Sequence, residues 1–377
     1  MRARRIAMAV FLMMAAASSL RADEGKIPLY QPTTIVAPGH YILTRDVAAS
    51  AAGGSVFDIQ ADGVTLNLNG FSVLCQPPDP CIAIGGGGGV SKGVTITGGT
   101  IVGGMYGIHA LNETIRHLSL SDLKLIGATD AAVKVDNAGL IEARGIIVVG
   151  GKVGIDAISA SGAPVSGIVP CVRVTRSAIR ADTGVRCTNM MCQIEDNSIA
   201  SCRTAVALVD AVASAVTGNA LSIPGEDVCF SQPPEPVAYM IGATNSTGLM
   251  ITDNHLRGDL VSNGNHHGIY FDATSDNATI ARNTVSRFGD NGIHVLSSNS
   301  WIDHNLVNDN MGHGLYVDGA NNFVENNKVA ANAMNGFFVN TSGHAYRGNV
   351  LRGNTMTAVG GPGAGAGGLT DGGGNIQ

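Results

Sequence analysis

Short apolar stretches recur at a nearly constant interval in the last third of the chain. Four of them begin with glycine and then alternate apolar and other residues, and they start 24, 22 and 22 residues apart, at Gly268, Gly292, Gly314 and Gly336. A second apolar stretch lies between successive copies and ends in an asparagine that returns every 22 residues, at Asn283, Asn305, Asn327 and Asn349. A repeat of this length with two or three short strands is typical of a solenoid.

The residues within each repeat favour strands over helices. The apolar positions are β-branched and alternate with polar ones, and no helical periodicity lies between them. Leucine-rich repeats have a similar length, but their L-x-x-L-x-L pattern is absent from the chain. We therefore predict an all-β chain whose parallel strands wind into a β-helix of about 11–13 coils, with about 22 residues per coil.

The recurring asparagines have a structural explanation. Ile302 and Val307 are five positions apart, so one flat strand cannot point both side chains inward. The chain must bend between them, and Asn305 tolerates the left-handed conformation that such a bend requires. Amide side chains stacked on successive coils can bond to one another as a ladder. We expect these asparagines to be structural.

The repeats are regular near the C-terminus and less regular toward the N-terminus. From the repeats and the composition at both ends we predict four segments. Residues 1–22 are expected to be a signal peptide and residues 23–60 an N-terminal cap. Residues 61–358 are expected to form the β-helix, and residues 359–377 a glycine-rich C-terminal tail. The cap is expected because an unpaired first coil would invite aggregation.

The first 22 residues have the composition of an export signal. Three arginines lie within the first five residues, and Ile6–Ala17 is an uninterrupted apolar run of 12 residues. This run is shorter than the roughly 20 residues that span a bilayer. Small residues follow it, although Leu20, Arg21 and Ala22 match a cleavage site imperfectly, which leaves an uncleaved anchor as the alternative. We expect a secreted or periplasmic protein with no membrane span.

Composition and charge exclude several other classes. Hydrophobic residues make up 45% of the chain and charged residues only 14%, which argues against both a disordered chain and a helical bundle. Removal of the leader would take away four of the 23 basic residues and leave 19 against 29 acidic ones, a net charge of −10. A nucleic-acid partner is not expected, because it would require clustered lysine and arginine.

The seven cysteines fit an exported chain, which can keep disulfides. Cys75 and Cys81 close a short proline-rich loop, and a bridge between them is plausible. Four more cysteines lie close together, so that one or two bridges could join neighbouring turns: Cys171, Cys187, Cys192 and Cys202. The pairing stays open, and the odd number leaves at least one thiol unpaired.

These asparagine-centred coils and their Gly-Ile-x-Val partners resemble the right-handed parallel β-helix repeat of the pectate-lyase-like superfamily. The resemblance runs from about Val64 to Thr357. It implies a right-handed coil of the exported bacterial type. Members of the superfamily include polysaccharide lyases, mannuronan epimerases, galacturonases and periplasmic proteins that mature the copper site of nitrous oxide reductase. Since one fold hosts many chemistries, the resemblance indicates the fold and leaves the function to the site.

Strand parity predicts where a site would lie. In each Gly-Ile-x-Val stretch the residue x points outward while its neighbours fill the core, and the four x residues are Tyr270, His294, Tyr316 and Phe338. A sugar ring can stack on such a row. The residues before each glycine form a polar row beside it: His267, Asn291, His313 and Asn335. Arg282 and Asp272 belong to the same coils.

We assign two sets of candidate roles on this surface. The candidate catalytic residues are His294, Tyr270, Tyr316, His267, His313 and Arg282, and the candidate substrate-binding residues are Phe338, Asn291, Asn335 and Asp272. His294 and Tyr270 could remove and return a proton at sugar C5, with an arginine or a cation neutralising the carboxylate. The alternative is that the rings form a packing ladder.

Three functions are compatible with these residues. The first is carbohydrate binding, with lyase or C5-epimerase chemistry on uronic-acid polymers, by a monomer whose partner is a polysaccharide. The second is a binding or surface β-helix without catalysis, and the absence of the D-P-H-D string of alginate epimerases and of the galacturonase Asp cluster leaves it open. The third is copper-site maturation.

Metal binding is a further possibility without a clear motif. Histidines are frequent between His255 and His313, and imidazole suits copper, yet no spacing fixes a geometry. A Ca²⁺ site is conceivable at Asp253, Asp272 and Asp276. His109 and His117 are expected to be ordinary surface residues.

Overall fold

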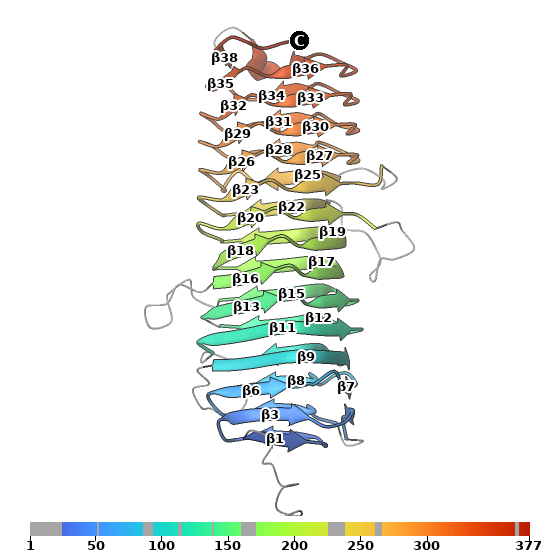
Figure 1. Ribbon diagram of the computed structural model, residues 1–377. Helices are drawn as coiled ribbons and strands as arrows, with labels where there is room; N and C mark the ends of the chain where they lie inside the picture. Colours follow the sequence, from blue (N-terminus) through green and yellow to red (C-terminus); the bar gives the residue numbers. More distant parts are fainter. Residues whose placement is uncertain are drawn as a thin grey trace, which may run out of the picture.

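The computed structural model describes residues 25–50, 53–85, 93–111, 115–137, 139–159, 171–224, 238–260, 266–365 and 369–377. These residues form an all-β parallel solenoid of about 12 turns with about 24 residues per turn. Figure 1 shows the coils stacked in chain order, with the first strands (blue) at one end of the column and the last (red) at the other. The predicted fold class and coil number are confirmed.

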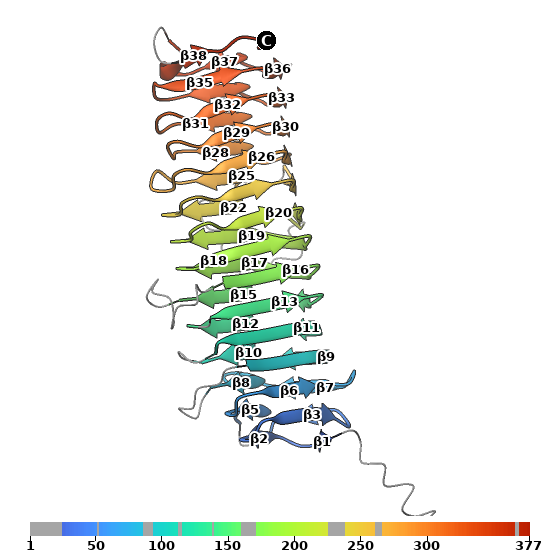
Figure 2. The ribbon, with the colours of Figure 1, turned by 60° about the vertical axis from the view of Figure 1, so that its left-hand side comes forward.

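Each complete coil contributes strands to three parallel stacks, which we call the first, second and third faces (Figure 2). The first face contains β1 (Lys26–Leu29), β3 (Gly39–Leu43), β6 (Val64–Asn67), the first halves of β9 (Gly93–Gly103) and β11 (His117–Ile126), β13 (Leu140–Arg144), β16 (Cys171–Thr175), β18 (Met191–Glu195), β20 (Ala215–Thr217), β23 (Met250–Thr252), β26 (Thr279–Ala281), β29 (Trp301–Asp303), β32 (Phe323–Glu325), β35 (His344–Arg347) and β38 (Leu369–Asp371).

The second face contains β4 (Val47–Ala48), β7 (Ser72–Cys75), the second halves of β9 and β11, β14 (Ile147–Val149), the first halves of β17 (Ala178–Thr188) and β19 (Ser198–Val209), β21 (Ala220–Ser222), β24 (His255–Arg257), β27 (Thr284–Ser286), β30 (Leu306–Asn308), β33 (Lys328–Ala330) and β36 (Val350–Arg352).

The third face contains β2 (Thr33–Ile35), β5 (Phe57–Ile59), β8 (Ile82–Ile84), β10 (Tyr106–Ala110), β12 (Ala131–Asp136), β15 (Val153–Ile158), the second halves of β17 and β19, β22 (Ala238–Thr244), β25 (His266–Phe271), β28 (Ile293–Val295), β31 (Leu315–Val317), β34 (Phe337–Val339) and β37 (Val359–Gly360). A 3-10 turn, η2 (Pro362–Ala364), follows β37.

The core is a continuous apolar column along the solenoid axis. Alternating side chains of each strand point inward, so Ile293 and Val295 are buried on either side of the half-exposed His294. The same alternation places Ile269, Leu315 and Phe337 in the core. The predicted 22-residue step holds from Asn283 to Asn349, whereas the step from Asn219 to Asn254 is 35 residues and that from Asn349 to Asn375 is 26, which raises the average.

An asparagine ladder lines the bend between the first and second faces, as predicted. Each side-chain amide donates to the Oδ1 atom of the next at 2.9–3.1 Å, and the ladder comprises Asn197, Asn219, Asn254, Asn283, Asn305, Asn327, Asn349 and Asn375. The left-handed conformation, however, belongs to the preceding residue: φ is 56° at Arg282 and 52° at His304. The preceding residue makes the turn, so that the asparagine can point inward and bond.

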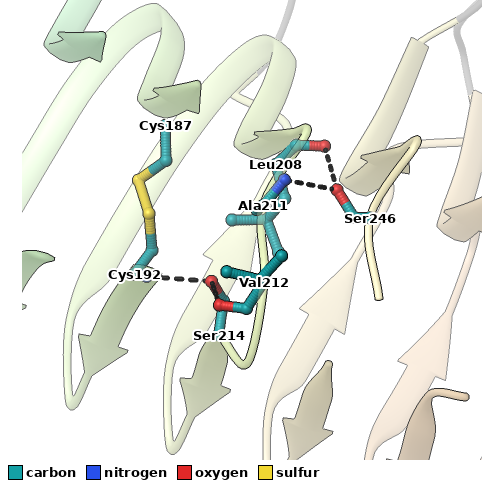
Figure 3. Close-up of a disulfide and its surroundings, with 7 residues drawn as sticks. All are labelled: Cys187, Cys192, Leu208, Ala211, Val212, Ser214 and Ser246. Atoms are coloured by element: carbon teal, nitrogen blue, oxygen red, sulfur yellow. Dashed lines mark hydrogen bonds between the residues drawn. A yellow bond between two sulfur atoms is a disulfide. The ribbon is translucent and has the colours of Figure 1, made fainter. Parts of the chain in front are cut away.

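The bend between the third and first faces is held by other groups. Cys187, in β17, and Cys192, in β18, form a disulfide across it (Figure 3). In the next coil the Ser214 hydroxyl accepts a hydrogen bond from the Cys192 N–H at 2.8 Å. Cys75 and Cys81 form the expected bridge, Cys202 is also disulfide-bonded, and Cys171 is a free buried thiol.

The strand stacks extend through most of the predicted cap and tail. β1 to β5 pair in parallel with the following coils, and β37 and β38 pair with β34 and β35. The predicted signal peptide, residues 1–22, lies outside the described residues. Within the described part of the chain, no helix has the length and apolar character needed to cross a membrane.

Candidate functional site

The predicted aromatic row is present on the outside of the third face. Tyr270 pairs in register with His294, His294 with Tyr316, and Tyr316 with Phe338. All four side chains are half-buried while their strand neighbours are buried. The parity argument was therefore correct for each of these four positions. We call them the aromatic row.

The rings of the row contact one another from coil to coil. The ring centroids of Tyr270 and His294 are 5.3 Å apart, those of His294 and Tyr316 are 4.4 Å apart, and those of Tyr316 and Phe338 are 5.1 Å apart. Ring stacking of this kind stabilises the sheet face and also offers a continuous apolar surface. The four side chains predicted to contact a sugar therefore form a packing ladder.

One ring of the row was missed in the sequence. Gly242 occupies the outward position one coil before Tyr270 and has no side chain. The ring of Tyr239 lies over it, since a Cβ atom at Gly242 would come within 2.1 Å of that ring. Tyr239 stacks on Tyr270 at 5.1 Å and thereby adds a fifth ring. The sequence signal for this ring was a glycine at the outward position, Gly242, with a tyrosine three residues earlier that could cover it.

The predicted polar row lies beside the aromatic row but beneath the surface. His267, Asn291, His313 and Asn335 are only 5–8% exposed. Their groups bond along the stack: the His313 N–H donates to Asn291 Oδ1 at 2.8 Å, and the Asn335 N–H donates to His313 Nδ1 at 3.2 Å. Asn291, His313 and Asn335 therefore support the aromatic row from behind.

A polar contact between His267 and His294 joins the two rows. Their Nε2 and Nδ1 atoms are 3.3 Å apart, and Asn291 Nδ2 lies 3.5 Å from the same His294 nitrogen. If His267 donates from Nε2, the proton of neutral His294 is on Nε2, a tautomer inferred from this network. His267 Nδ1 and His294 Nε2 are buried without a hydrogen-bond partner.

Burial keeps both imidazoles neutral. It lowers the pKa of His267 to about 4 and the pKa of His294 to about 3. A neighbouring histidine lowers each pKa value further, His266 that of His267 and His267 that of His294. Burial also raises the pKa of Tyr270 and Tyr316, with the nearby carboxylates of Asp272 and Asp318 acting in the same direction. At neutral pH the aromatic row is an uncharged surface bordered by acids.

Asp272 and Arg282 have different positions relative to the row. Asp272 follows Tyr270 by two residues, and its carboxylate accepts hydrogen bonds from the Ser275 hydroxyl at 2.6 Å and the Thr274 N–H at 3.2 Å. Arg282 lies at the bend between the first and second faces and pairs with Asp253 at 2.7 and 2.8 Å. The assignment of Arg282 to the site was wrong, because its position in the coil places it at another corner.

The metal sites considered from the sequence do not form among the described residues. No group of three or more His, Cys, Asp or Glu side chains there is arranged to hold a metal ion. Asp253 is paired with Arg282, Asp272 caps its own turn, and Asp276 accepts a hydrogen bond from the Ser298 N–H. Asp253 therefore lies at a different bend from Asp272 and Asp276, and each of the three carboxylates is bonded to protein groups.

A charged segment of the same outward column was also missed. Below Gly242 the register continues through Ala207 to Arg186, Asp156, Lys134 and His109. Asp156 is 3% exposed and accepts hydrogen bonds from Lys134 at 2.6 Å and from Arg186 at 2.7 Å through each of two nitrogens. Burial alone would raise the pKa of Asp156, but the hydrogen bonds and positive charges of Arg186 and Lys134 outweigh it, so the pKa is lowered. His109, predicted to be an ordinary surface residue, pairs with Asp136 at 3.0 Å.

Comparisons with known proteins agree with this fold. The family described as "Right handed beta helix region" matches residues 239–375. No curated protein matches the chain. Among solved structures, the mannuronan C-5 epimerase AlgE6 A-module of Azotobacter vinelandii is 13% identical, with a TM-score of 0.38, covering 96% of this chain and 93% of that one.

Two further solved structures are similar at the same level. The DFA-IIIase of Arthrobacter chlorophenolicus A6 is 13% identical with a TM-score of 0.43, over 85% of this chain and 90% of that one. The periplasmic alginate epimerase AlgG is 15% identical with a TM-score of 0.37, over 79% of this chain and 64% of that one. The family match covers residues 239–375, and the strand pairing shows that the same parallel β-solenoid continues through the described coils that precede them.

Proposed function

We propose that this protein binds an extended polysaccharide along the outward column of its third face. The observation that carries the proposal is the aromatic row: four side chains in register, joined by Tyr239, that present contiguous rings on a rigid sheet. Successive coils are separated by about 4.8 Å, so the five rings extend over about 19 Å. Exposed aromatic surface on a rigid scaffold marks binding sites.

The charged segment supports an acidic polysaccharide as the ligand. Arg186 lies three coils below Tyr270, which corresponds to about 14 Å. A chain lying along the column would stack sugars on the rings and present a carboxylate to the half-exposed guanidinium of Arg186, since Lys134 is nearly buried between Asp136 and Asp156. The small outward residues between them, Ala207 and Gly242, leave the path clear apart from the Tyr239 ring. The basic and apolar leader supports placement outside the cytoplasm.

Affinity electrophoresis tests this proposal. The wild-type protein is run through native gels that contain alginate, pectate, xylan or hydroxyethyl cellulose, alongside Tyr316→Ala and the control Leu306→Ala. Leu306 is exposed on the second face and leaves the row intact. We expect alginate or pectate to retard the wild type and the control, and Tyr316→Ala to migrate freely. Equal retardation of all three proteins would contradict the proposal.

A second candidate function is proton abstraction from the bound sugar. It rests on His294 and Tyr270, whose rings contact each other on the outward column. It requires His294 to break its Nδ1 contact with His267 and to turn a free ring nitrogen toward the sugar. Lyase activity would release unsaturated uronates that absorb in the ultraviolet, and epimerase activity would exchange the C5 proton in deuterated water. Activity that His294→Gln abolishes while retardation in the gel persists would establish catalysis. Binding without turnover would leave the protein a binding β-helix.

A further inference from the structure

Two exposed aromatic side chains lie on the first face, away from the aromatic row. Trp301, the single tryptophan of the chain, is 49% exposed, and Phe323 is 51% exposed. They are direct partners on the adjacent strands β29 and β32. Among the residues that the structure describes, neither ring contacts another aromatic ring, unlike the rings of the aromatic row. Both rings therefore have a free surface. Stacking between rings, which stabilises the aromatic row, does not explain why these two side chains are exposed here.

These rings border a shallow, open groove on the first face. It has a volume of about 470 Å³ and is lined by Trp301, Phe323, Asn277, Ala278, Thr279, Asn299, Glu325 and Arg347. The outward neighbours of the aromatic pair on the adjacent coils are the small residues Thr279 and Ala345. They leave room beside the rings for a ligand. We call this site the tryptophan groove.

The polar rim of the groove contains one acidic and one basic side chain, which pair with each other. Glu325 is 12% exposed at its side chain and pairs with Arg347 through Nε at 2.8 Å and Nη2 at 3.2 Å. The pair leaves no net charge to attract an ion, but it retains carboxylate lone pairs and guanidinium N–H groups for hydrogen bonding. Asn277 and Asn299 provide amide groups at the other edge. Planar rings beside amides and a compensated ion pair match a ligand with an apolar face and a hydroxyl-rich edge.

We propose that the tryptophan groove binds a neutral hexopyranose unit of a glycan. The C–H face of the sugar would stack on Trp301 and Phe323, and its hydroxyl groups would bond to Glu325 and Arg347. This site is separate from the third face and does not depend on the function proposed there. With both sites, one molecule would hold glycan on two faces of the solenoid.

The single tryptophan makes the groove directly observable. Intrinsic fluorescence of the full chain is titrated with cellohexaose, xylohexaose and mannohexaose, and with a mannuronate hexamer for comparison. We expect a saturable change in Trp301 emission with at least one neutral hexasaccharide. Phe323→Ala is expected to weaken that binding about tenfold, or about 1.4 kcal/mol. Tyr316→Ala and Leu306→Ala are expected to leave it unchanged.

Three outcomes would overturn the proposal. The first is the absence of a saturable emission change with any neutral hexasaccharide at millimolar concentration. The second is an equal change in the wild type and in Phe323→Ala. The third is self-association in sedimentation experiments that Trp301→Ala abolishes, because the occupant would then be a second copy of the chain. Since Tyr316→Ala affects only the aromatic row, failure of one site is distinguishable from failure of the other.

Discussion

Asn305 shows how a single buried amide connects three coils. Its Nδ2 donates to the Ile280 carbonyl at 2.8 Å and to Asn327 Oδ1 at 3.0 Å. Its Oδ1 accepts from both the N–H and the Nδ2 of Asn283 at 3.0 Å. All of these groups are buried, and a buried polar group without a partner costs about 1–3 kcal/mol. The ladder therefore fixes the bend through hydrogen bonding.

Replacement of Asn305 by valine should destabilise the protein by about 1–3 kcal/mol. The substitution leaves the buried Asn283 N–H without its acceptor and removes the side-chain donor to the Ile280 carbonyl and to Asn327 Oδ1. Chemical denaturation gives the free energy of unfolding directly. Asn308→Val, on an outward position of the same coil, is the matched control and should change stability by less than about 0.5 kcal/mol. Equal stability of the two variants would show that the ladder bonds are dispensable.

The buried imidazoles make stability depend on pH. An unfolded histidine has a pKa of about 6.5, whereas the folded values are about 4 for His267 and about 3 for His294. Below pH 6.5 the unfolded chain therefore binds more protons than the folded one, and stability falls as the pH falls. Between pH 6.5 and 5 the loss should reach up to about 2 kcal/mol per histidine.

Denaturation curves measured from pH 7 to pH 5 test this dependence. His294→Phe keeps a ring in the row but removes a titrating group, so its stability should fall less steeply than that of the wild type. Phe338→Leu changes the same row without altering its titratable groups and should keep the wild-type slope. Parallel slopes for the wild type and His294→Phe would mean that His294 is not held neutral by the fold.

At the scale of elements, the bends between faces differ in how they are held. The Cys187–Cys192 disulfide spans the bend between β17 and β18 and closes a short loop, with a sequence separation of 5. The coils after residue 266 form without a disulfide among their described residues and depend on asparagine and serine side chains instead. The disulfide therefore adds a covalent link to a bend that hydrogen bonds also stabilise.

Removal of this disulfide should cost about 2 kcal/mol, because a short closed loop restrains the unfolded chain only modestly. The variant is Cys187→Ala with Cys192→Ala, measured by thermal unfolding against the wild type. Cys171→Ala, which removes a free buried thiol, controls for the loss of sulfur from the core. A loss no larger than that of Cys171→Ala would indicate that the bridge adds nothing to stability.

Strand parity allowed the outward residues of the third face to be predicted, and the recurring asparagines allowed the ladder at one bend to be predicted, but neither pattern gives the direction of the other side chains at that bend. The alternation around Ile293 and Val295 was enough to place His294 outward. It contained no information on where the bend residue Arg282 points, and that assignment failed. Tyr239 was missed because a glycine, Gly242, holds the outward position of its coil. The segment from His109 to Arg186 lies on strands of the same repeat, but its charged residues were not assigned to a site.

At the scale of the whole molecule, the solenoid turns a sequence repeat into straight surface columns. On the third face one column joins the charged segment around Asp156 to the aromatic row, and on the first face another contains the tryptophan groove. Both columns are rigid because each strand pairs with the coils above and below it. A linear polymer would match this geometry, since its repeating units can contact equivalent positions on successive coils.

The central claim is that the aromatic row contacts polysaccharide, and tyrosine NMR tests it most directly. The protein is labelled with ¹³C at the tyrosine rings, assigned by single Tyr→Phe variants, and titrated with alginate and pectate hexasaccharides. We predict saturable shifts of Tyr239, Tyr270 and Tyr316, while Tyr30 and Tyr41 in the first coils stay unchanged. Unmoved row signals under conditions where the gel shows binding would place the ligand elsewhere and contradict the account.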